Sequence, residues 1–156
     1  MPDGSAPKNP TSVRLALTTL GGWSFSYAPP ERALTPVIGP SKPLALLVYL
    51  SAMPGHAARR EHLADLLWAD LDPDAARHAL RQTLWHLRRR VGAEIIQANG
   101  DQIALIATLD TDRDAFLAAV EQQDHDRAVA FYAGEFLPGF AAPGGAEFER
   151  WAEVER

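Results

Sequence analysis

Five arginines lie in one short stretch of the chain, residues 76–92, which reads ARHALRQTLWHLRRRVG and contains no Asp or Glu. Acidic residues outnumber Lys and Arg by 20 to 15 in the whole chain, so this excess of positive charge is local. Arginine guanidinium groups pair with phosphates and with guanine edges, and a glutamine amide pairs with adenine. The stretch is therefore chemically suited to binding a nucleic acid.

Residues typical of helix ends predict a helix over residues 73–91. Asp72 can act as the N-cap, Pro73 suits the first helical position, and Gly92 suits the C-terminal cap. Such a helix is about 28 Å long and fits the major groove of duplex DNA.

The apolar residues of this helix indicate how its other side chains point. At about 100° per residue, Leu80, Leu84, Leu87 and Val91 form one buried stripe. The opposite side lacks the Glu that a merely solvated helix usually mixes with Arg, so we expect it to read base edges. The predicted base-reading residues are Arg77, His78, Arg81, Gln82, Trp85, Arg88 and Arg89.

Two alternatives remain open for this surface. An Arg-rich amphipathic helix can be a solvated face with no ligand. Trp85 can contact the sugars of DNA or pack against a protein partner, and the second is slightly favoured because an exposed aromatic ring is typical of interfaces.

The flanking elements would position this helix. Apolar and polar residues alternate over residues 13–27, which predicts a small antiparallel sheet. Helices are expected at residues 42–53 and within RREHLADLLW, residues 59–68.

Asn99-Gly100 is a strong hairpin signal between two strands, and it predicts that Ile96 faces Ile103 and that Gln97 faces Gln102. A short helix, a turn, a basic helix and a hairpin make a winged helix-turn-helix.

Residues 42–92, with REHLADLLW and ALRQTLWHLRRRVG, resemble the OmpR/PhoB-type winged-helix domain of the Streptomyces antibiotic regulatory protein (SARP) family. The segments DAFLAAVEQQDHDRAVAFYAGEFLPGF and FERWAEVER are similar to the start of the bacterial transcriptional activator domain, a tetratricopeptide-like helical array. The resemblance implies an α+β fold: an N-terminal antiparallel sheet, three helices and a C-terminal hairpin wing, with a helical extension. The expected parts are a disordered N-terminus (1–11), a winged-helix domain (12–107) and the start of the helical domain (108–156).

This resemblance implies a sequence-specific transcriptional regulator, an activator, located in the cytoplasm at the nucleoid. Helix 73–91 would lie in the major groove of promoter DNA and hairpin 94–107 would act as the wing. Direct repeats in the DNA, a homodimer on DNA and RNA polymerase are the implied partners, and no cofactor or membrane is involved. The expected phosphate and wing contacts are Lys42, Arg59, Arg60, Gln97, Asn99 and Gln102. Arg59 stands where relatives favour a Ser or Thr cap, so the second helix is expected to begin without a side-chain cap.

A protein-interaction adaptor is the rival function. Residues 1–103 contain 11 Lys and Arg against 9 Asp and Glu, whereas residues 104–156 contain 4 against 11, so an acidic helical tail could do the binding. We expect no enzyme, because no Ser, His and Asp grouping, phosphate loop or zinc-protease motif stands out. No metal site is expected either: the chain has no Cys, and His78 and His86 would be about 12 Å apart along the helix.

Overall fold

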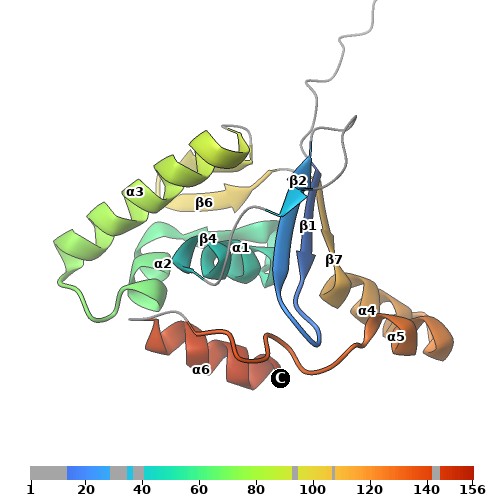
Figure 1. The fold of residues 1–156 in the computed structure, drawn as a ribbon. Coiled ribbons are helices and arrows are strands. Elements are labelled where there is room, and N and C mark those ends of the chain that lie inside the picture. Colours follow the sequence, from blue (N-terminus) through green and yellow to red (C-terminus); the bar gives the residue numbers. More distant parts are fainter. Residues whose placement is uncertain (1–13, 29–34, 37–40, 93–94, 107, 142–144) are drawn as a thin grey trace, which may run out of the picture.

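Two small sheets and a set of helices surround one buried helix, α1 (Figure 1). The computed structural model describes residues 14–28, 35–36, 41–92, 95–106, 108–141 and 145–156. The strands are β1 (Arg14–Thr18), β2 (Ser24–Ala28), β3 (Thr35–Pro36), β4 (Ala57–Arg59), β5 (Ile96–Asn99), β6 (Gln102–Leu105) and β7 (Thr108–Thr111). The helices are α1 (Lys42–Ala52), α2 (Arg60–Leu67), α3 (Pro73–Val91), α4 (Asp112–Glu121), α5 (His125–Phe131) and α6 (Ala146–Glu155), with a short 3₁₀ turn at Pro54–His56.

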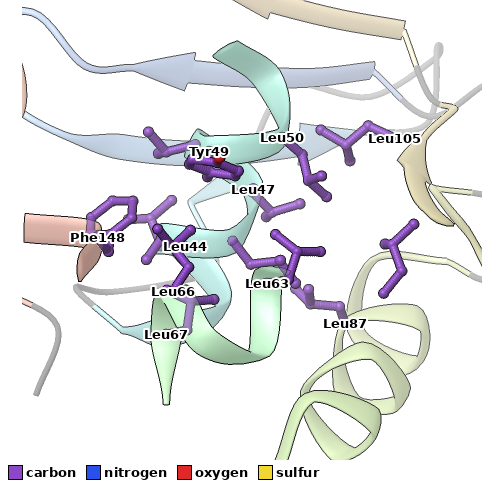
Figure 2. Packing of buried hydrophobic residues seen from close by; sticks show 14 of the residues in the cluster. Leu44, Leu47, Tyr49, Leu50, Leu63, Leu66, Leu67, Leu87, Leu105 and Phe148 are labelled. Carbon is purple, nitrogen blue, oxygen red and sulfur yellow. The ribbon is translucent and has the colours of Figure 1, made fainter. Parts of the chain in front are cut away.

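The core is built around α1, whose eight residues 44–51 are all buried. Leu63 from α2, Leu87 from α3 and Leu105 from β6 pack around it, as does Phe148 from α6 (Figure 2). The Tyr49 hydroxyl lies 2.7 Å from Nε2 of His62, and the Tyr49 ring packs edge-on against Trp151 of α6. The helix at the end of the chain is therefore part of the same core as the helices before it.

The first sheet has the strand order β3-β2-β1-β7. β1 pairs with β2 in antiparallel fashion, as the alternating pattern predicted, and with β7 in parallel fashion. Because β7 begins at Thr108, its pairing with β1 crosses the predicted boundary at residue 107. That boundary stays a prediction, and the predicted disordered start, residues 1–11, lies outside the described residues.

α3 has the predicted bounds and the predicted phase. The Asp72 carboxylate accepts a hydrogen bond of 2.9 Å from the Ala75 backbone N–H, and Gly92 at the C-terminal cap has φ 130°. The predicted stripe is buried: Leu80, Leu84, Leu87 and Val91, joined by Ala76. The residues opposite this stripe consequently face away from the core.

The hairpin after α3 forms, but its predicted register is wrong. Asn99 pairs with Gln102 and Ile96 pairs with Leu105, so the loop is Gly100-Asp101 and not Asn99-Gly100. Gly100, at φ 60°, occupies the first loop position, where a type II′ turn has its glycine. Because the side-chain pattern of a strand repeats every two residues, both registers bury Ile96 and Ile103, and the pattern could not distinguish them.

β4 completes the second sheet, whose strand order is β4-β6-β5. One face of this sheet packs on the core through Ile96, Ile103 and Leu105. The other face, which carries Arg59, Asn99 and Gln102, is exposed. None of the helices in the described ranges is long and apolar enough to cross a membrane.

Candidate nucleic-acid interface

α3 runs along the outside of the molecule (Figure 1), and its other side packs against α2 and α1. Six of its exposed residues form a surface that we call the α3 outer face: His78, Arg81, Gln82, Trp85, His86 and Arg89. The first five of these line a shallow hollow of about 320 Å³. The surface therefore combines cations, an amide and an aromatic ring, which are side-chain types that can contact base edges in the major groove.

Trp85 is the centre of this surface. Its side chain is 53% exposed, which is unusual for so large an apolar ring. The guanidinium carbon of Arg89 lies 4.8 Å from the centre of the Trp85 ring, and the His86 ring meets the same indole edge-on at 4.9 Å. Two neighbours on the same helix therefore contact the exposed ring.

The arginines of α3 fall into two groups by their partners. Arg77 makes ion pairs with Glu61 of α2 at 2.9 Å and with Asp74 at 2.7 Å, and the hydrogen bond to Glu61 is the main reason that the pKa of Arg77 is raised. Arg81 and Arg89 make no ion pair with any carboxylate in the part of the chain that the structure describes. Their charges are thus available to a ligand.

Arg88 has an intramolecular partner as well. Its Nε–H donates to the backbone carbonyl of Ile96 at 3.4 Å, and the residue is partly buried. Arg77 and Arg88, both predicted as base-reading residues, therefore connect α3 to α2 and to β5. In this conformation they position the helix, whereas Arg81 and Arg89 project from it.

The second sheet brings three predicted contact residues into one row. Arg59 of β4 pairs with Gln102 of β6, which pairs with Asn99 of β5, so their side chains lie side by side on the exposed face. Gln97 is on the same face, two residues before Asn99. One cation and several amides suit phosphate contact.

The start of α2 has a partner that the sequence did not indicate. No side chain caps this helix, as predicted from Arg59, but the Arg60 backbone N–H donates to the Asp101 carbonyl at 2.6 Å. A carbonyl at the tip of the hairpin thus accepts a hydrogen bond from one backbone N–H group at the start of α2. The donor and acceptor lie 41 residues apart, and no local signal links them.

Lys42, another predicted phosphate contact, is partly buried at the start of α1. Its ammonium lies 5.0 Å from the centre of the Trp68 ring. Burial lowers the pKa of Lys42, and the charge of Asp70 opposes that shift. Lys42 therefore contributes to packing between α1 and the end of α2 as well as carrying charge.

A second exposed surface lies on α4 and α5, and its chemistry is different. A hollow of about 290 Å³, which we call the α4–α5 groove, is lined by Phe116, His125, Ala128, Val129 and Tyr132. Val129 is 75% exposed and Tyr132 51%. Within the described ranges, no group of three or more His, Asp or Glu residues could hold a metal ion.

EmbR from Mycobacterium tuberculosis, solved in complex with a low-affinity phosphopeptide, is similar in structure to this chain, with a TM-score of 0.64 and 18% sequence identity. The match covers 91% of this chain and 41% of EmbR, so the chain spans less than half of EmbR's length. At this identity the similarity shows a shared fold, and the predicted α+β class is confirmed. No family model and no curated protein matches the chain.

Proposed function

We propose that this protein is a DNA-binding transcriptional regulator of the SARP type that reads promoter sequence with the α3 outer face. The observation that carries the proposal is the pair Arg81 and Arg89, which project from α3 without a carboxylate partner among the described residues and flank Gln82 and Trp85. Burying unpaired guanidinium groups against guanine edges or phosphates satisfies their donors. The fold shared with EmbR supports the architecture that this function needs.

In this proposal α2, the turn after it and α3 form a helix-turn-helix, and β5–β6 form the wing. α2 and α3 pack against each other, and the hairpin follows α3 directly. The helix-turn-helix arrangement leaves the second helix free to enter the major groove. The row formed by Arg59, Gln102 and Asn99 would contact phosphates, together with Arg60, Gln97 and Lys42.

The wider assembly is also part of the proposal. The resemblance to SARP regulators favours an activator that binds direct repeats as a homodimer, contacts RNA polymerase and works at the nucleoid in the cytoplasm. α4, α5 and α6 would then be the start of the tetratricopeptide-like extension. No catalytic step and no cofactor is proposed.

A protein-interaction adaptor is the second candidate, because of the α4–α5 groove. The two helices that form it also carry exposed carboxylates, among them Asp114, Glu121 and Asp126. An exposed apolar patch with a polar rim is typical of a protein-binding site. This surface is compatible with DNA binding by α3, but on its own it would make the protein an adaptor.

Selection of duplexes from a randomised library, followed by fluorescence anisotropy at several salt concentrations, tests the first proposal. The parent protein should enrich a defined sequence and bind it with an affinity that falls as salt rises. Arg81→Ala and Arg89→Ala should each weaken specific binding by about 1 to 3 kcal/mol and change stability by under about 0.5 kcal/mol. Arg127→Ala, which removes a cation from α5, is the matched control and should bind as the parent does.

Two outcomes would reverse the assignment. If no sequence is enriched, the protein does not read DNA. If Arg81→Ala and Arg89→Ala both bind the selected duplex as tightly as the parent, the arginines are a solvated surface. In either case the adaptor becomes the leading function.

A further inference from the structure

We propose that Trp85 and Arg89 act as one reading unit that recognises a thymine next to a guanine, with the Trp85 ring against the thymine C5-methyl group. This inference rests on the proposed DNA-binding function and specifies what the α3 outer face reads. Trp85 would be the residue that determines specificity for thymine, and Arg89 the residue that binds the neighbouring guanine.

The geometry of the pair supports reading of adjacent bases. Trp85 and Arg89 are one turn apart on the same side of α3, and the Arg89 guanidinium carbon lies 4.8 Å from the ring centre. Successive bases on one DNA strand are spaced by about 3.4 Å. Two groups held at this separation can face two neighbouring base edges without moving apart.

The chemistry of the indole selects thymine among the four bases. In the major groove only thymine offers a methyl group, beside its O4 acceptor. The Trp85 ring provides a large apolar surface, and its Nε1–H can only donate a hydrogen bond. The cytosine edge offers an amino donor that an indole cannot accept, so cytosine is disfavoured at the same position.

Arg89 suits the adjacent guanine. Its guanidinium makes no ion pair within the residues that the structure describes, and guanine presents two acceptors, O6 and N7, in the major groove. Contact with the Trp85 ring restricts the otherwise flexible Arg89 side chain. A restricted side chain loses less conformational freedom when it binds a base.

The surroundings of Trp85 favour DNA over a protein partner. The residues that share its hollow, Arg81, Gln82, His78 and His86, are polar or cationic. Protein-binding sites usually present several apolar residues together, as the α4–α5 groove does. A single indole among polar and cationic side chains instead matches a groove lined by phosphates and base edges.

Thymine-to-deoxyuridine substitution tests the inference, because it removes only the methyl group. The duplex enriched by the parent protein is prepared in versions in which each thymine in turn is replaced by deoxyuridine, and dissociation constants are measured by fluorescence anisotropy. One thymine next to a guanine should show binding weakened about fourfold, the worth of one buried methyl group. Trp85→Ala should bind the thymine and deoxyuridine duplexes equally, whereas Trp85→Phe should keep the difference.

Tyr132→Ala, which removes an exposed aromatic ring at the C-terminal cap of α5, is the control and should keep the full thymine preference. Thermal melts check that Trp85→Ala is folded, as its exposure leads us to expect. If every deoxyuridine duplex binds like the thymine duplex, or if Trp85→Ala keeps the preference, the inference is wrong while DNA binding stands. If the parent enriches no duplex at all, the inference and the proposed function fail together.

Discussion

α3 and the α4–α5 pair both expose one side to solvent, but they bury very different amounts of apolar surface. α3 buries every large aliphatic residue of its inner stripe and exposes several arginines, Gln82 and Trp85. α4 and α5 bury only Ala119 and Ala128 and expose Leu117, Val120, Val129 and Tyr132. The comparison indicates that α3 buries its apolar side in the core and exposes a polar surface, whereas the α4–α5 pair leaves an apolar surface exposed.

Truncating one aliphatic residue in each region gives the largest expected difference. Leu84→Ala leaves a cavity under α3, where the side chain is 2% exposed, and should lower the free energy of unfolding by about 2 to 5 kcal/mol. Val129→Ala on α5 removes a side chain already in solvent and should change it by under about 0.5 kcal/mol. Urea denaturation of both variants measures this. Equal losses would show that the two regions are buried alike.

Removing the hydrogen bonds between Asp112 of α4 and the two residues Thr19 and Leu20, which follow β1, should have the next largest effect. The Asp112 carboxylate accepts hydrogen bonds from the backbone N–H groups of Thr19 and Leu20, at 2.8 to 3.0 Å, and from the Thr19 hydroxyl. Asp112→Ala would leave these buried donors unpaired, at a cost of about 1 to 3 kcal/mol. Asp112→Ala should accelerate amide hydrogen exchange more in α4 than in α3. An equal acceleration in both helices would contradict a role of Asp112 in holding α4 in place.

Two N-cap aspartates allow a smaller, matched test. The Asp72 carboxylate caps α3, and the Asp124 carboxylate caps α5 by accepting from the Arg127 N–H at 3.2 Å. Because α3 is part of the core, Asp72→Ala should lower the free energy of global unfolding by about 1 kcal/mol. Asp124→Ala should change mainly the local exchange of α5 amides, since a sparsely buried helix opens without global unfolding. An equal shift of both denaturation midpoints would count against this distinction.

The phosphate contacts should give the smallest effect, and one that does not depend on sequence. Arg59→Ala, Arg60→Ala and Lys42→Ala should each weaken binding evenly across duplexes and reduce the slope of log K against log salt by about one unit. Arg150→Ala on α6, whose guanidinium pairs with Glu147, is the control. A change in sequence preference in any of the three would mean that the residue reads a base.

Much of α3 could be predicted from local sequence. Its bounds follow from Asp72, Pro73 and Gly92, because capping depends on neighbouring residues, and its buried stripe follows from the helical period of its leucines. The identities of the outward residues follow from that phase. The predicted roles in DNA binding remain predictions, and the selection experiment tests them.

The partners of those residues could not be predicted, because they come from distant parts of the chain. Whether Arg77 projects or pairs depends on Glu61 of α2, and whether Arg88 projects depends on the Ile96 carbonyl. Tertiary packing also selected the hairpin register, since the strand pattern is the same after a shift of two residues. The helical repeat of apolar residues and the capping of helix ends depend on residues close together in sequence, so both can be predicted from the sequence. The pairing of charges and of strands depends on which surfaces meet when the core forms.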